Sequence, residues 1–202
     1  MAEHSRYDVS GDEGVLVNKL GITEQKRLDN TETLLLQDTY AHFFTLHQTK
    51  KLKFDVKLIF EIHKYFLNTL YSWAGKIRVV EISKDGILFC ASSQIKKALE
   101  NFGHILKKNT PLLKDSKKII SKKLAIVHCE FNAIHPFREG NGRTIRLFVD
   151  LLAVKSGYGL IDYRKTLKAN YIKACISGMQ KDYTKMQRIL YERLLNGLHH
   201  SK

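Results

Sequence analysis

The densest group of chemically reactive side chains lies in twelve consecutive residues, HPFREGNGRTIR, from His135 to Arg146. An imidazole is largely neutral at pH 7, so His135 could accept a proton from an attacking hydroxyl. A carboxylate such as Glu139 is a hard ligand that Mg²⁺ uses together with phosphate and water. We therefore interpret His135 as the candidate general base and Glu139 as the candidate metal ligand.

A glycine-rich turn follows the carboxylate, and the apolar run of residues 145–154 behind it predicts a helix. The first amide N–H groups of a helix lack intrahelical partners, and the helix dipole adds partial positive charge there. Two arginines three residues apart would project side by side and could bind phosphates through planar donors. The candidate anion-binding residues are Gly140, Asn141, Gly142, Arg143 and Arg146.

Each of these features alone has an ordinary structural explanation. The glycines could form a plain turn, Glu139 and the arginines a salt bridge at the start of a helix, and His135 a packed histidine. Together they place a base, a metal ligand, an anion site and cations around one volume the size of a nucleotide. This combination favours phosphoryl or nucleotidyl transfer, in which positioning and charge neutralisation carry the catalysis.

The elements that must hold this segment are predicted to be mainly helical. The chain has 202 residues, 44% hydrophobic content and only two prolines, which favours one helical domain with a single core. We expect seven to eight helices around a central buried helix, because the helix after Arg143 is apolar on nearly every side. Residues 1–22 are predicted to form an arm packed on a core of residues 23–202.

One segment changes to a two-residue period. Apolar residues alternate from Ile77 to Phe89 around Asp85-Gly86, a pair that tolerates tight hairpin turns. We predict a β-hairpin over about residues 77–90. A lone hairpin is marginally stable in water, so it must lean on the helices or on a guest chain.

Charge and composition limit the class of protein. No apolar run approaches the roughly 20 residues of a membrane span, and the polar start lacks a signal-peptide core, so we expect a cytoplasmic protein without a membrane partner. Cys90, Cys129 and Cys175 are widely spaced and are expected to be reduced. The net charge of +14 suits a polyanionic partner, but the lysines occur as scattered pairs typical of solvated helix faces. Direct nucleic-acid binding is therefore not expected.

The twelve-residue segment is similar, at every defining position, to the HxFx(D/E)GNGRxxR signature of the Fic family. The YSWAGKIR stretch at residues 71–78, together with Leu16, Asn18 and Leu20-Gly21, also resembles the flanks of bacterial Fic proteins, so the resemblance covers residues 7 to about 180. It implies a Fic-type helical bundle with a β-hairpin flap. It also implies AMPylation, the transfer of AMP from ATP to a Ser, Thr or Tyr hydroxyl of a target protein with release of pyrophosphate.

The resemblance assigns a role to each residue of the segment. His135 would deprotonate the target hydroxyl, Glu139 would hold Mg²⁺ between the α- and β-phosphates, and Phe137 would anchor the loop in the core. The turn becomes the anion hole, and Arg143 and Arg146 would bind the β- and γ-phosphates. Tyr171 resembles an aromatic residue near the adenine in relatives, with core packing as an equal alternative.

The hairpin resembles the family's flap, which docks the target segment by adding it as a strand. The residues expected to dock the target are Val80, Glu81, Ile82, Ser83, Lys84, Asp85 and Gly86.

Many Fic proteins carry an inhibitory (S/T)xxxE(G/N) pattern whose glutamate pairs with the second arginine of the motif. Here Glu13, Glu100 and Glu139 are the glutamates followed by Gly or Asn, and none has Ser or Thr four residues before it. We hypothesise that Arg146 is restrained by a small antitoxin-like protein that donates the glutamate, or is unrestrained. Relatives without the pattern resemble toxins that act on B-type subunits of type II topoisomerases, which suggests the target. Delivery into another cell is an alternative.

Other functions remain open at this stage. Relatives of the fold move phosphate or phosphocholine, so a phosphotransferase is one alternative, and a nucleotide-binding pseudoenzyme or a basic nucleic-acid binder is another. The intact GNGR at residues 140–143 favours AMP transfer from ATP, because it leaves room for the β- and γ-phosphates.

Overall fold

The structure, a computed structural model, describes residues 9–10, 14–49, 52–84 and 87–197. Its helices are α1 (Gln25–Thr49), α2 (Val56–Leu67), α3 (Ile95–Asn109), α4 (Lys117–Ile134), α5 (Asn141–Lys155), α6 (Lys168–Met179) and α7 (Thr184–Arg193), with 3₁₀ turns η1 (Ser92–Gln94) and η2 (Tyr163–Lys165). Two antiparallel ribbons pair β1 (Val9–Ser10) with β2 (Val15–Leu16) and β3 (Ser83–Lys84) with β4 (Ile87–Leu88). The predicted mainly α fold is confirmed.

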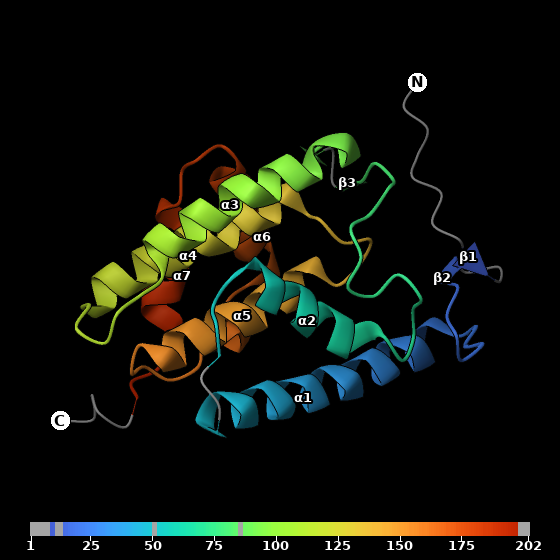
Figure 1. Cartoon of the computed structure of the whole chain (residues 1–202), viewed down its shortest axis with the longest axis horizontal. Coiled ribbons are helices and arrows are strands. Elements are labelled where there is room, and N and C mark those ends of the chain that lie inside the picture. Colours follow the sequence, from blue (N-terminus) through green and yellow to red (C-terminus); the bar gives the residue numbers. More distant parts are fainter. Residues whose placement is uncertain (1–8, 11–13, 50–51, 85–86, 198–202) are drawn as a thin grey trace.

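Helix α5 is the centre of the bundle. Figure 1 shows it between α4 and α1, and α2 also packs against it. Every residue from Leu147 to Ala153 is buried, which confirms the predicted central helix. Each buried large apolar side chain contributes roughly 1.5–3 kcal/mol, so this helix anchors the core. Its amino end carries the motif.

The helices that flank α5 begin where their sequences provide a capping side chain. The carboxylate of Asp55 accepts a hydrogen bond from the Leu58 N–H at 3.2 Å and starts α2. The hydroxyl of Ser116 accepts from the Ile119 N–H at 3.4 Å and starts α4. These bonds satisfy amide groups that have no partner within the helix. They fix where α2 and α4 begin beside α5.

The N-terminal segment from residue 14 to 22 lies against α2 and the loop after it. Val15 and Ile22 are buried in a small apolar cluster, and the Lys19 N–H donates to the Leu70 carbonyl at 2.8 Å. The division into an arm and a core at residue 22 stays a prediction. Residues 1–8 and 11–13 of that arm lie outside the described residues.

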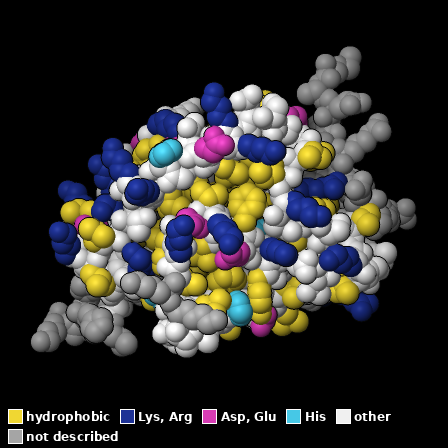
Figure 2. Space-filling model, in the orientation of Figure 1, with side chains coloured by type: hydrophobic (Ala, Val, Ile, Leu, Met, Phe, Trp, Pro, Cys, Tyr) yellow, Lys and Arg dark blue, Asp and Glu magenta, His cyan; other side chains and the backbone are white. Residues whose placement is uncertain are grey.

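Basic side chains are spread over the face seen in Figure 2, around a hydrophobic area, and do not gather in a single patch. This distribution agrees with solvated helix faces. Within the described residues, no helix is long and apolar enough to span a membrane.

The hairpin is present but shorter than predicted. Ser83 pairs with Leu88 and Lys84 with Ile87, while the turn at residues 85–86 lies outside the described residues. Beyond these pairs, the Phe89 N–H donates to the Ile82 carbonyl at 3.2 Å. Nearer the ends of the predicted flap, the carbonyls of Val80 and Cys90 accept from Arg78. The hairpin leans on the body through two buried side chains, Ile82 and Phe89.

Arg78 ties the base of the hairpin to the motif. Its side chain is buried and donates from Nε to the His135 carbonyl at 2.8 Å and from Nη1 to the Val80 carbonyl at 2.6 Å. Nη2 donates to the Cys90 carbonyl, and the Arg78 N–H donates to the Pro136 carbonyl at 2.8 Å. One guanidinium therefore joins both ends of the hairpin to the start of the motif.

His63 of α2 supports the part of the motif that contains Phe137 and Glu139. Its Nδ1 accepts from the Gly75 N–H at 2.8 Å, so the proton resides on Nε2, which donates to the Glu139 carbonyl at 2.9 Å. The ring stacks on Phe137 with centroids 3.7 Å apart. Burial lowers the pKa of His63 to about 4, so the ring stays neutral at pH 7.

We expect Arg78→Lys to loosen the hairpin, because an ammonium cannot reach the carbonyls that the planar guanidinium joins. The free energy of unfolding should fall by about 1–3 kcal/mol, and amide hydrogen exchange should rise across residues 80–90. Arg188→Lys, on the exposed surface of α7, is the matched control. Unchanged exchange in the hairpin of Arg78→Lys would contradict this role.

We expect His63 to make stability depend on pH. Its native pKa lies below the ordinary value near 6.5, so the stabilisation is complete above pH 6.5 and is lost as pH falls towards 4. The loss is about 1.4 kcal/mol per pH unit. Denaturant unfolding at pH 7, 6 and 5 should show a shallower slope for His63→Gln than for wild type. His104→Gln, at an exposed position, should keep the wild-type slope; equal slopes in all three proteins would refute the assignment.

Candidate active site

His135 follows α4 in a left-handed conformation, with φ 50° and ψ 59°, which is uncommon for a non-glycine residue. Its Nδ1 lies 3.2 Å from the Asn132 carbonyl, which can only accept, so Nδ1 carries the proton. The lone pair is then on Nε2, so this nitrogen could accept a proton. Phe89 of the flap stacks on the ring with centroids 3.9 Å apart and holds its plane.

The loop between His135 and α5 is closed by one buried side chain. Asn141 accepts from the Phe137 N–H at 2.9 Å through Oδ1 and donates from Nδ2 to the Phe137 carbonyl at 2.8 Å. Its side chain is therefore committed to the loop, and only its backbone amide is available for an anion. Phe137 is fully buried, as expected for an anchor.

The amino end of α5 is open. Gly140 is the N-cap with φ 80°, and no side chain caps the helix. The first amides, those of Asn141, Gly142 and Arg143, lack intrahelical acceptors and coincide with the positive end of the helix dipole. A Cβ at Gly142 would meet no atom within 4 Å, so the turn borders open space there. These are the features of an anion-binding site.

Glu139 presents a partly exposed carboxylate beside this helix end, with 44% of its side chain accessible. Oε1 accepts from the Gly140 N–H at 2.7 Å and lies 3.4 Å from Arg143 Nη2. The described residues contain no cluster of three or more metal-ligating side chains. A single carboxylate next to an anion site fits Mg²⁺, which takes its remaining ligands from phosphates and water.

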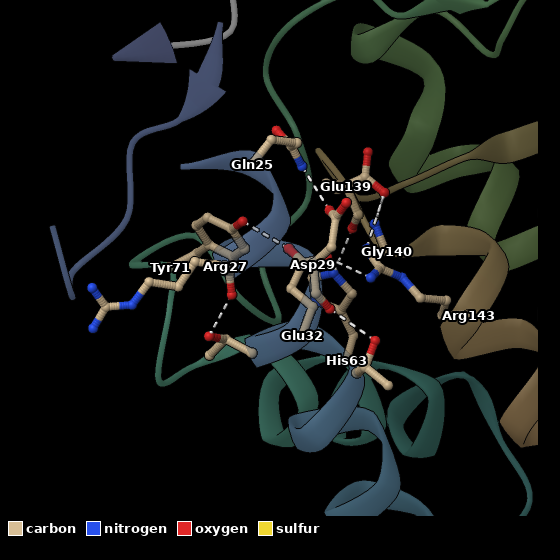
Figure 3. A network of polar contacts seen from close by, with 11 residues as sticks. Gln25, Arg27, Asp29, Glu32, His63, Tyr71, Glu139, Gly140 and Arg143 are labelled. Carbon is tan, nitrogen blue, oxygen red and sulfur yellow. Dashed lines mark hydrogen bonds and ion pairs between the residues drawn. The ribbon is translucent and has the colours of Figure 1, made fainter. Parts of the chain in front are cut away.

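Arg143 is already paired within the protein. Nη1 makes a short ion pair with Glu32 of α1 (Figure 3). The guanidinium carbon lies 5.0 Å from the centroid of the Phe66 ring. Glu32 is not among the residues predicted for the site, although the sequence contains a signal for it. Glu32 lies four residues after buried Leu28 on the inward face of α1, where a carboxylate requires a cationic or hydrogen-bonding partner.

Arg146 lies next to aromatic side chains. Its guanidinium is 5.8 Å from the Tyr163 ring centroid and 5.7 Å from that of Tyr171. The Tyr171 hydroxyl hydrogen-bonds His128 Nε2 at 2.6 Å, and burial, with Arg146 nearby, lowers the pKa of His128 to about 3. Tyr171 is thus held by core contacts, and its adenine-side role stays a prediction.

The residues predicted to dock a target, 80–86, form the first half of the flap. The Val80 carbonyl is used by Arg78, Glu81 accepts from the Ser92 N–H and hydroxyl at 2.9 and 2.6 Å, and Ile82 is buried. Ser83 and Lys84 form β3, whereas Asp85 and Gly86 lie outside the described residues. Their docking role stays a prediction.

Known proteins resemble this chain in sequence. It is 34% identical over 182 residues to a protein named Protein adenylyltransferase VbhT of Bartonella schoenbuchensis, a match that covers 90% of this chain and 37% of that protein. It is 30% identical over 180 residues to Probable protein adenylyltransferase y4lH of Sinorhizobium fredii, covering 83% of this chain and 85% of that one. The chain therefore spans well under half of the first relative and most of the second.

Solved structures share the fold at lower identity. An N-terminal Fic domain of a putative cell filamentation protein from Bartonella quintana matches with a TM-score of 0.78 at 22% identity, over 97% of this chain and 95% of that one. The BepC protein from Bartonella tribocorum, solved with bound AMPPNP, matches with a TM-score of 0.77 at 22% identity, over 96% of this chain and 99% of that one.

The family assignment rests on residues 53–153, which match the Fic/DOC family and run from before α2, through the flap, α3 and α4, to the last turn of α5. The sequence relatives extend the similarity across most of the chain. With the motif placed between α4 and the open end of α5, this chain belongs to the Fic/DOC family.

Proposed function

We propose that this chain is a Mg²⁺-dependent protein adenylyltransferase that moves AMP from ATP to a Ser, Thr or Tyr hydroxyl of a target protein. The observation that carries the proposal is one short loop with a base at its first residue and an uncapped helix end at its last. The names of its sequence relatives support the adenylyl group as cargo. The AMPPNP bound to a structural neighbour supports ATP as its source.

In the proposed reaction, Nε2 of His135 takes the proton of the target hydroxyl as the oxygen attacks the α-phosphorus. The bond from the α-phosphorus to its bridging oxygen breaks, and pyrophosphate leaves. The amides of α5 and the guanidinium of Arg146 hold the β- and γ-phosphates, and Arg143 adds positive charge from the side of Glu139. Glu139 would hold Mg²⁺, which neutralises phosphate charge when bound. Tyr171 is the proposed adenine-side residue.

The proposed acceptor is a polypeptide, because the flap offers a place for an extended chain. The β3–β4 ribbon has only two strands, and Val79 and Leu88 expose 88% and 68% of their surfaces. An added strand would pair with a free edge and cover apolar side chains. This geometry would set the hydroxyl next to His135, since Phe89 connects the flap to the imidazole.

The proposed control acts on Arg146. Within the described residues no carboxylate forms an ion pair with it, whereas Arg143 is paired with Glu32. A small antitoxin-like protein could therefore supply a glutamate to Arg146, or the enzyme works unrestrained. We propose the B-type subunit of a type II topoisomerase in the bacterial cytoplasm as the first target to test.

We expect the purified chain, given labelled ATP and Mg²⁺, to add one AMP to a target peptide detected by mass spectrometry. His135→Ala should lower the rate by at least about 10²-fold while nucleotide affinity stays within about twofold, because the imidazole acts on the hydroxyl. His104→Ala is the surface control. A gain of phosphate would indicate a phosphotransferase, and no adduct from wild type would indicate a nucleotide-binding protein; either result overturns the proposal.

The two turn glycines should respond differently to alanine. At Gly140 the residue needs φ 80° and a Cβ would lie 2.8 Å from Leu67 Cδ1, so Gly140→Ala should cost more than about 1 kcal/mol of stability. At Gly142 no atom is in reach, so Gly142→Ala should fold like wild type but bind ATP about tenfold more weakly. Thermal unfolding and calorimetric ATP titration measure both effects. Wild-type ATP affinity in Gly142→Ala would argue against phosphate binding at this turn.

A further inference from the structure

Glu32 is a buried carboxylate that the proposed reaction does not use. It belongs to α1, about a hundred residues before the motif, and exposes 6% of its surface. Two groups compensate its charge: the Tyr71 hydroxyl donates to Oε1 at 2.7 Å, and Arg143 Nη1 pairs with Oε2 (Figure 3). A carboxylate is costly to bury without such partners, so a specific arrangement is maintained here.

Arg143 therefore stands between two carboxylates. Nη1 is paired closely with Glu32, whereas Nη2 lies 3.4 Å from Oε1 of Glu139. The side chain of Glu32 is 8% exposed and that of Glu139 is 44% exposed. An ion pair is stronger at short distance and away from water. The charge of the Arg143 guanidinium is therefore neutralised mainly by Glu32. The negative charge of Glu139 is neutralised less by Arg143 than that of Glu32.

The position of Glu32 is fixed by its second partner. Tyr71 follows α2, and its ring is fully buried and stacks on Trp73 with centroids 4.3 Å apart. Its hydroxyl can donate only where the carboxylate is correctly oriented. Glu32 thus joins three segments, α1, the end of α2 and the start of α5, at one carboxylate.

We propose that Glu32 is a positioning residue: by pairing more closely with Arg143 it keeps the Arg143–Glu139 ion pair long, at 3.4 Å, and so leaves the Glu139 carboxylate accessible to a divalent cation. The inference rests on the proposed function for the identity of that cation. Without the charge of Glu32, Arg143 would move onto Glu139, which it already approaches. The guanidinium and the cation would then compete for the same carboxylate oxygens.

Glu32→Gln tests this directly, because the amide keeps the shape and can still accept from Tyr71 but has no charge. Mn²⁺ binding is followed by electron paramagnetic resonance with a nonhydrolysable ATP analogue at saturation, and AMP transfer is followed against Mg²⁺ concentration. We expect both midpoints to rise at least about fivefold. Transfer at saturating Mg²⁺ should return to within about twofold of wild type.

Asp38→Asn is the matched control. Asp38 lies on the same helix and also accepts a tyrosine hydroxyl, that of Tyr65 at 3.0 Å, but within the part of the chain that the structure describes it forms no hydrogen bond with the motif. Its metal midpoints should equal those of wild type. The double variant Glu32→Gln/Arg143→Gln removes the competitor and also avoids an unpaired arginine. It should restore the wild-type Mn²⁺ midpoint, and it tests the inference even where the single variant folds poorly.

Two results would overturn the inference: a Glu32→Gln protein with an unchanged Mn²⁺ midpoint and a lower maximal rate, or a double variant that binds Mn²⁺ as weakly as the single one. Both would leave Glu32 a purely structural role. The proposed function fails separately, if wild type binds Mn²⁺ and the analogue but transfers no AMP.

Discussion

The structure depends on one constraint: α5 must be buried along its length while its first turn stays uncapped. Its apolar residues from Leu147 to Ala153 fill the centre of the bundle, so the helix cannot shift without losing the core. A side chain can satisfy the first amides of a helix, as Asp55 does for α2 and Ser116 for α4. Here Gly140 occupies that position and caps nothing. The unsatisfied amides are thereby held at a fixed place by a helix that is buried in the core.

The loop in front of α5 is held from several sides by residues distant in sequence. His63 bonds the Glu139 carbonyl, Arg78 bonds the His135 carbonyl, and Asn141 closes the loop on Phe137. These contacts use buried donors and acceptors, which are costly to leave unpaired. The backbone of the loop is thereby fixed by residues outside the motif and by Asn141, which sets the positions of its reactive side chains.

The two arginines of the motif differ in how far neighbouring carboxylates neutralise their charge. Arg143 is paired with a buried carboxylate, and Arg146 borders tyrosine rings without an ion pair among the described residues. The first arginine is thus neutralised within the protein, whereas the second lies beside Tyr163 and Tyr171. In the proposed arrangement, Glu139 stays accessible to a cation because Glu32 pairs more closely with the neighbouring Arg143.

The sequence alone determined the twelve-residue motif, the helical class, the central position of α5 and the existence of the hairpin. These features follow from spacing and periodicity over a few residues, which local rules describe well. Only the tertiary structure revealed Glu32, which contacts Arg143 across 111 positions, and the bracing roles of His63 and Arg78. It also showed a shorter paired hairpin, whose ends bond Arg78 through the Val80 and Cys90 carbonyls. Such contacts depend on how the helices pack. No local pattern in the sequence specifies that Glu32 is the partner of Arg143.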